Sequence, residues 1–151
     1  MSDDPKSIVV IGGGSGSSVA LRGLKSHNVY LTAIVTMFDS GGSTGILREE
    51  FGYPPLGDIR QCLVALSPED SEQVSALNSA LDFRFNSMSS LQGHSVGNLV
   101  LAALTTVYNG VQGAIDELSR MMQLQGQVVP VTLDEAHLCA RLVDGAVIRT
   151  E

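Results

Sequence analysis

The sequence predicts an α/β fold of the Rossmann type, an open and mainly parallel sheet with helices on both faces. Residues 7–11 form a β-branched run that ends in three glycines, which is typical of a buried parallel strand. Residues 17–25 have the apolar spacing of a helix, and residues 29–36 form a second apolar strand. Together these segments make a βαβ unit, whose crossover we expect to be right-handed.

The rest of the chain predicts more helices and two more strands. Pro54 and Pro55 interrupt the chain, and Asp58 can cap a helix that carries Ile59 and Leu63. The further helices are expected over residues 71–81, 96–107 and 111–124, and the further strands over 127–131 and 146–148. Because no internal repeat or low-complexity linker separates these segments, we expect residues 1–151 to form one domain.

Composition and charge exclude several classes of function. The net charge is −7 and the nine Lys and Arg residues are scattered, so we expect no nucleic-acid partner. The first residues are acidic, unlike a signal peptide, and no apolar run is long enough for membrane insertion. Cys62 and Cys139 show no metal or disulfide spacing and are expected to be buried thiols. These features predict a cytoplasmic protein.

The first glycine-rich loop is a candidate phosphate loop. It follows a strand and opens a helix, where free N–H groups and the helix dipole attract an anion. The dinucleotide-binding pattern G-x-G-x-x-G is incomplete, because Ser17 stands where its third glycine should be, and no Walker A lysine follows the loop. A simple tight turn is therefore the alternative. The candidate residues are Gly12, Gly13, Gly14, Ser15 and Gly16.

The second glycine-rich loop follows the second strand. Ligands of open α/β sheets lie outside the carboxyl ends of the strands, so both loops are expected to flank one crevice. Asp39 is a candidate for a metal ion or for a ribose hydroxyl, and Gly41, Gly42 and Ser43 offer a backbone nest and a hydroxyl. Such residues are also ordinary turn formers, which is the alternative.

The segment Gly93-His94-Ser95-Val96-Gly97 matches the pattern of a hydrolase nucleophile elbow. The residues before it make a poor strand, so we favour a second interpretation, in which His94 and Ser95 cap the helix that follows. Asn98 would then face the same crevice one turn later. An N-cap without any ligand role is an equal alternative for Ser95.

Two charged residues near the prolines are also candidates. Asp58 is first a helix cap, and it joins the site if its helix points at the crevice. Arg60 is a candidate phosphate partner, with a solvated surface arginine as the alternative.

These motifs stand in the order found in a known family. Residues 12–16, 36–45, 54–67, 93–99 and 129–132 resemble the YvcK-type gluconeogenesis factors, in the larger group that includes 2-phospho-L-lactate transferase, CofD. The resemblance implies a Rossmann-like fold and places the glycine loop, Asp39, Ser43, Asp58, His94 and Asn98 around a nucleotide-containing ligand. It covers only the amino-terminal half of these longer proteins.

The resemblance implies two functions. YvcK-like members are UDP-sugar-binding regulators of carbon metabolism, cell-envelope synthesis and cell shape, whereas CofD is a magnesium-dependent transferase acting on a nucleoside-diphosphate-linked donor. The family usually has two acids where this chain has Asp39 and Ser40. Loss of one carboxylate weakens a divalent-metal site, so a non-catalytic binder with a UDP-sugar or another nucleotide ligand is favoured. An NAD-binding module is a third reading, and a homo-oligomer is a candidate assembly.

Overall fold

The structure is a computed structural model that describes residues 4–38, 41–86, 88–134 and 136–149. Three parallel strands make its main sheet: β1 (Lys6–Gly12), β2 (Val29–Val35) and β3 (Gln127–Pro130), in the spatial order β1-β2-β3. Val10 pairs with Ala33, which in turn pairs with Val128. The predicted Rossmann-like α/β class is confirmed, and so are its first two strands with the helix between them, α1 (Ser15–Leu24).

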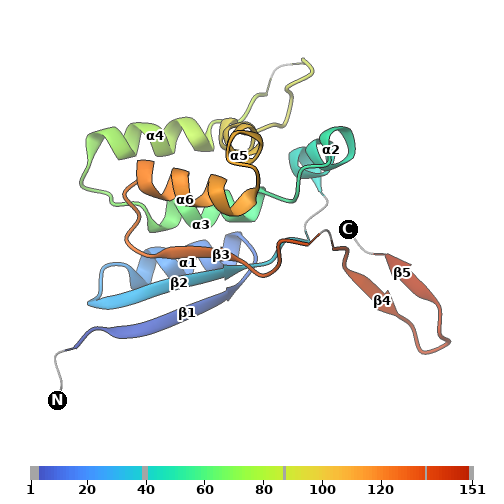
Figure 1. Cartoon of the computed structure of the whole chain (residues 1–151), viewed down its shortest axis with the longest axis horizontal. Coiled ribbons are helices and arrows are strands. Elements are labelled where there is room, and N and C mark those ends of the chain that lie inside the picture. The colour runs from blue at the N-terminus through green and yellow to red at the C-terminus, as the bar shows by residue number, and fades with distance from the viewer. Residues whose placement is uncertain (1–3, 39–40, 87, 135, 150–151) are drawn as a thin grey trace.

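The hydrophobic core lies between the sheet and a layer of helices (Figure 1). α1, α3 (Gly57–Leu66) and α6 (Val111–Met121) contact the strands. Alternate residues of a strand point to opposite faces, and Leu31, Ala33 and Val35 of β2 are buried beneath these helices. The apolar, β-branched composition of β2 follows from this burial. Residues 7–11 were expected to form a buried strand, which is wrong, because no residue of β1 is buried in the described structure.

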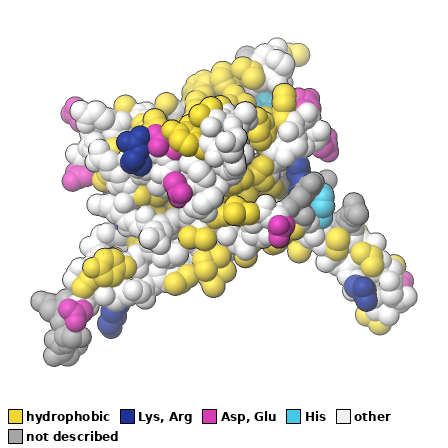
Figure 2. Space-filling model, viewed as in Figure 1, with side chains coloured by type: hydrophobic (Ala, Val, Ile, Leu, Met, Phe, Trp, Pro, Cys, Tyr) yellow, Lys and Arg dark blue, Asp and Glu magenta, His cyan; other side chains and the backbone are white. Residues whose placement is uncertain are grey.

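The other face of the sheet remains open in the described residues. Val9, Ile11 and Tyr30 lie on that face and are 53%, 70% and 66% exposed. Figure 2 shows exposed hydrophobic side chains on this lower side of the molecule, where Figure 1 draws the sheet. The described helices therefore form one layer, and the second layer that the sequence predicts is not among them.

The remaining helices are α2 (Gly42–Phe51), α4 (Glu72–Asp82) and α5 (Val96–Val107). Helices α4 and α5 match predicted segments. Helix α2 was expected to be a glycine-rich loop, which is a correction: Gly41 is the N-cap, and Gly52 ends the helix in the left-handed conformation with φ of 70°. Glycines at both boundaries obscured the short helix between them, because glycine is a loop signal in sequence.

A two-stranded hairpin of β4 (Cys139–Arg141) and β5 (Val147–Arg149) extends away from the sheet (Figure 1). The predicted Asp144–Gly145 turn is confirmed, with φ of 88° at Gly145 and the Asp144 carboxylate accepting a hydrogen bond from the Ala146 N–H at 2.9 Å. Strand β4 was not predicted. Cys139 lies on it and is exposed, so its expected burial is wrong, whereas Cys62 is buried as expected. No helix of the described residues is long and apolar enough to cross a membrane.

Candidate functional site

The glycine loop joins β1 to α1 at the carboxyl edge of the sheet. The Gly12 carbonyl accepts a hydrogen bond from the Thr36 N–H at 2.9 Å, which ties the end of β1 to the end of β2. Helix α1 begins at Ser15, and its N-cap, Gly14, has no side chain to cap it. The loop thus lies between a strand end and a helix start, as expected, while a phosphate role for it stays a prediction.

The face of this loop is occupied by two side chains of α3. A Cβ atom on Gly13 would lie 2.9 Å from Asp58 Oδ2, and one on Gly14 would collide with Asp58 Oδ1 and lie 2.7 Å from Gln61 Nε2. Ser15 Oγ also donates a hydrogen bond to Gln61 Oε1 at 3.3 Å. The glycines are therefore needed for close packing against the chain itself, and a carboxylate lies beside them.

Asp58 is a site residue by position, although it is not the predicted cap. The N-cap of α3 is Leu56, and Asp58 is the second residue of the helix, where an acid stabilises the helix dipole. Burial raises the pKa of the Cys62 thiol to about 12, and the Asp58 carboxylate adds to this rise. Cys62 is therefore a neutral thiol and not a nucleophile.

A buried polar cluster connects α2 with the start of α5. Ser43 Oγ lies 2.8 Å from His94 Nδ1, and Asn98 Nδ2 donates to Ser43 Oγ at 3.4 Å. All three residues are buried. Asn98 Oδ1 is also buried and has no hydrogen-bond partner in the described part of the chain. The structure thus brings together three predicted site residues that are 51 and 55 positions apart in sequence.

Ser95 is a helix cap and does not form a nucleophile elbow. Its Oγ accepts a hydrogen bond from the Asn98 N–H at 3.2 Å, and the residue is fully buried. The residues before it form turns, apart from one isolated bridge between Arg84 and Ser95. A nucleophile needs an exposed oxygen at a strand-to-helix turn, so the capping interpretation is confirmed for Ser95. The His94 ring instead lies against Ser43.

The second glycine-rich segment is described only in part. Asp39, the candidate metal or ribose ligand, lies outside the described residues. Gly41 and Gly42 form the start of α2, and Gly42 has a positive φ of 52°. Gly16, in the first loop, is in helix α1 with open space around it.

Arg60 is buried and paired with an acid. It is 6% exposed and forms an ion pair with Asp82, so the alternative of a solvated surface arginine is wrong. Its side chain lines a concavity between α1 and α3 that also includes Ser15 of the glycine-rich loop, and a phosphate role for Arg60 stays a prediction.

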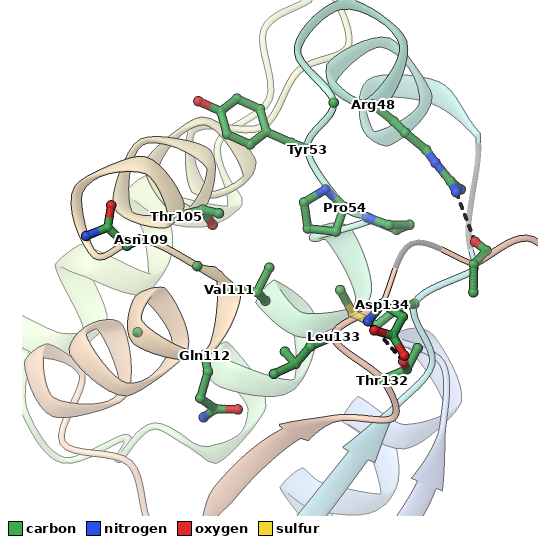
Figure 3. Close-up of a pocket in the computed structure, with 16 residues that line it drawn as sticks. Arg48, Tyr53, Pro54, Thr105, Asn109, Val111, Gln112, Thr132, Leu133 and Asp134 are labelled. Atoms are coloured by element: carbon green, nitrogen blue, oxygen red, sulfur yellow. Dashed lines mark hydrogen bonds between the residues drawn. The ribbon is translucent and has the colours of Figure 1, made fainter.

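A cavity of about 440 Å³ opens beyond the carboxyl ends of β2 and β3 (Figure 3). Its wall combines Met37 after β2, the end of α2 with the two prolines, the turn between α5 and α6, and the segment after β3. Several residues of the lining have polar side chains. They are Arg48, Tyr53, Thr105, Asn109, Gln112, Thr132 and Asp134.

None of the predicted site residues in the described part lines this cavity. Sequence reasoning placed the crevice at the first two strand ends, whereas the cavity lies at the second and third. Thr132 and Asp134 follow β3. Polar residues after a parallel strand are the sequence feature from which this cavity could have been predicted. Helix α2 connects the cavity with the buried cluster of Ser43, His94 and Asn98, because it carries both Arg48 and Ser43.

Hydrogen bonds shape the cavity wall. Arg48 donates to the Ala136 carbonyl at 2.9 Å, which fastens α2 to the segment after β3 (Figure 3). Tyr53 Oη lies 2.6 Å from Thr106 Oγ1, which joins the proline segment to α5. Asn109 and Gly110 have positive φ values of 53° and 147°, so the turn between α5 and α6 is tight. The cavity is thus a built feature of four chain segments.

The donor set for a metal ion is limited. In the described residues no three His, Cys, Asp or Glu side chains gather into a group that could hold one. Asp58 is a single carboxylate beside the glycine loop, and magnesium is often held by one or two carboxylates together with water and substrate phosphates. A magnesium role at Asp39, which lies outside the described residues, stays a prediction.

Comparisons with known proteins give the family. The family model described as 2-phospho-L-lactate transferase CofD matches residues 8–151. A gluconeogenesis factor of Bacillus subtilis is 44% identical over 151 residues, which cover 100% of this chain and 46% of that protein. A gluconeogenesis factor of Halalkalibacterium halodurans is 42% identical over 97% of this chain and 44% of its own.

Solved structures agree with this match. A crystal structure of a UPF0052 family protein from Bacillus halodurans superposes with a TM-score of 0.89 at 40% identity, over 98% of this chain and 46% of that one. The chain spans slightly less than half the length of these relatives and matches their amino-terminal part. It therefore belongs to the CofD family, among relatives called gluconeogenesis factors.

Proposed function

We propose that this chain binds a nucleotide sugar of the UDP-sugar class in the cavity of Figure 3 and acts as a regulator without chemistry of its own. The observation that carries the proposal is the cavity of about 440 Å³ at the strand ends, with the start of α6 in its wall. Small-molecule sites have volumes of roughly 300–1,000 Å³ and lie at this edge of α/β sheets.

The wall has the mixed chemistry that a nucleoside requires. Pro54, Pro55 and Leu133 give it apolar surface on which a planar base can pack. Thr132 and Asp134 offer hydroxyl and carboxylate oxygens to ribose or sugar hydroxyls, and the Asp134 N–H already donates to Thr132 Oγ1 at 3.0 Å. This fixed pair gives the polar edge a defined orientation.

The start of α6 supplies the contact for a diphosphate. Gly110, Val111, Gln112 and Gly113 all line the cavity, and they span the N-cap and first turn of this helix. The first turn carries no acid, and the glycine N-cap provides no side-chain hydrogen bond in the described residues. Free N–H groups at a helix start bind phosphate. Arg48 adds a cation to the same cavity.

The regulatory part of the proposal rests on the relatives and on the site. The similar proteins are called gluconeogenesis factors, a name that indicates a role in carbon metabolism. The described residues present no exposed nucleophile at the predicted elbow, because Ser95 is fully buried. A sensor that reports the level of a nucleotide sugar accounts for both observations.

A second candidate is a transferase that acts on a nucleoside-diphosphate-linked donor. It is favoured by the family description and by the Asp58 carboxylate beside the glycine loop. In this candidate Asp39 is the magnesium ligand, as the sequence predicts. Measurable turnover that disappears in Asp39→Asn would establish it in place of the sensor.

Calorimetric titration of the chain tests the proposal. UDP-N-acetylglucosamine, GDP and NAD are compared, each with and without magnesium. We expect binding of the UDP-sugar without magnesium, and a loss of about tenfold in affinity in Arg48→Gln, since a hydrogen bond to a charged group contributes roughly 1.5–3 kcal/mol. Arg141→Gln, on the exposed strand β4, is the matched control and should bind like the wild type. Equal affinities of the wild type and Arg48→Gln would contradict the proposal.

A further inference from the structure

A second concavity, of about 430 Å³, lies between α1 and α3. Ser15, Ser18 and Arg22 of α1 form one wall, and Arg60 and Gln61 belong to α3. Asp82 and Arg84, at and after the end of α4, close it. We call it the arginine groove. It shares no lining residue with the cavity of Figure 3, so it is a separate feature of the surface.

Positive charge is concentrated in the arginine groove. The chain has a net charge of −7 and only nine Lys and Arg residues, and three of the nine line this one feature. A single acid, Asp82, faces them. Like charges held close together repel each other, so an anion between the guanidinium groups would relieve this repulsion.

Arg60 is built into the groove and is not a loose surface side chain. It is 6% exposed, it pairs with Asp82, and its buried Nε has no hydrogen-bond partner in the described part of the chain. Gly97 makes room for it, because a Cβ there would collide with Arg60 Cδ and lie 2.7 Å from the Leu81 carbonyl oxygen. The packing against Gly97 and the ion pair with Asp82 hold the Arg60 guanidinium in the wall of the groove.

Ser15, the first residue of α1, also lines the groove. The Asp58 carboxylate lies beside Gly14 at this helix start and offsets the positive end of the helix dipole. The preference for an anion therefore rests on the three arginines.

From this arrangement we propose that the arginine groove is a binding site for a phosphate group of a small metabolite, separate from the nucleotide-sugar cavity. Arg22 and Arg84 are exposed, and Arg84 also donates a hydrogen bond to the Gly93 carbonyl, whereas Arg60 is buried beside Asp82. Planar guanidinium groups bind phosphate oxygens in pairs of parallel hydrogen bonds, which suits a diphosphate or a phosphate ester. The site goes beyond the proposed function and does not depend on it.

The test uses inorganic pyrophosphate as the probe, titrated into the whole chain at low salt. We expect binding that weakens as salt is added, and Arg22→Gln and Arg84→Gln should each lose about tenfold in affinity. Asp82→Asn removes the competing carboxylate from Arg60, so it should bind pyrophosphate more tightly than the wild type. Arg141→Gln, an exposed arginine on the hairpin, is the matched control and should be unchanged.

The arginine groove and the nucleotide-sugar cavity can be tested independently. Arg84 also donates to the Gly93 carbonyl, so circular dichroism must show that Arg84→Gln is folded, and Arg22→Gln carries the test if it is not. Unchanged pyrophosphate affinity in Arg22→Gln, or no binding by the wild type, would overturn the groove. The UDP-sugar affinity of these variants should equal that of the wild type, so either site can fail without the other.

Discussion

The glycine loop after β1 and the start of α6 are both helix N-termini preceded by glycine, but they differ in what surrounds them. At the glycine loop, Asp58 and Gln61 occupy the space where a ligand would approach the backbone. At the start of α6, Gly110 and Gly113 face a cavity of about 440 Å³ with Arg48 in its wall. One start is packed against an acid, and the other lines a cavity whose wall also includes a cation.

This difference shows that a glycine-rich strand end does not by itself define a phosphate site. The same free N–H groups attract an anion only where the adjoining side chains leave room and do not carry negative charge. Asp58 supplies that charge at the first loop. We therefore propose that the nucleotide diphosphate binds at the start of α6. Three sets of variants test this proposal.

The largest expected effect is that of Gly113→Ala compared with Gly14→Ala. A Cβ at Gly113 would lie 2.8 Å from the Tyr108 Cβ and 3.0 Å from its carbonyl oxygen, so backbone must move. We expect a loss of about 1–3 kcal/mol in unfolding free energy, together with weaker UDP-sugar binding. At Gly14 the colliding atoms are the ends of flexible side chains, so Gly14→Ala should lose less stability and keep its UDP-sugar affinity.

Urea unfolding and calorimetry measure both quantities. Gly23→Ala is the control for the substitution itself, because Gly23 is helical with open space around it and should gain roughly 0.5–1 kcal/mol. A UDP-sugar affinity that falls in Gly14→Ala and not in Gly113→Ala would reverse the comparison.

Ser43→Ala should have an intermediate effect, on stability alone. The change removes the partner of His94 Nδ1 and Asn98 Nδ2 inside a buried cluster. Leaving buried polar groups unsatisfied costs about 1–3 kcal/mol, which thermal or urea unfolding will show. Ser26→Ala removes an exposed hydrogen bond to the Gly23 carbonyl and should change stability by less than about 0.5 kcal/mol. Equal effects of the two variants would mean that the cluster adds nothing.

The strand pattern made most of the fold predictable. Residues 7–11 and 29–36 are apolar and β-branched, and a short apolar run of this kind is visible in sequence. Helix α2 was missed because its boundaries are glycines, and β4 because three exposed residues carry no pattern. The open face of the sheet was also not visible, since exposure of an apolar strand depends on which layers cover it.

Only the local features of the site could be predicted from the sequence. The capping role of Ser95 and the meeting of Ser43, His94 and Asn98 agree with the order of the motifs. The position of Asp58 against the glycines, and that of Arg60 beside Asp82, depend on how α3 packs on α1 and α4. Such contacts join distant segments, and no local pattern records them.

Cys62 makes the stability of the fold depend on pH. Its pKa rises from 9.0 to about 12 in the folded chain, so the folded thiol keeps a proton that the unfolded thiol loses. The stabilisation is complete below pH 9 and is lost as pH rises toward 12, with a slope of at most about 1.4 kcal/mol per pH unit.

Urea unfolding from about pH 8 to about pH 10.5 should therefore show a flatter profile in Cys62→Ala than in the wild type. Cys139→Ala, at an exposed thiol, should keep the wild-type slope. Asp58→Asn should lower the pKa of Cys62, because it removes the nearby carboxylate. An identical slope in the wild type and Cys62→Ala would show that Cys62 does not titrate in this range.

The most direct measurement of the central claim is a nuclear magnetic resonance titration of the ¹⁵N-labelled chain with UDP-N-acetylglucosamine. The account predicts that the largest amide shifts occur at Gly110, Gln112, Gly113 and Thr132, around the cavity of Figure 3. The amides of Gly13 and Gly14 should change little, because Asp58 and Gln61 cover them. Largest shifts at Gly13 and Gly14, with an unchanged start of α6, would contradict the account and return the diphosphate to the glycine loop.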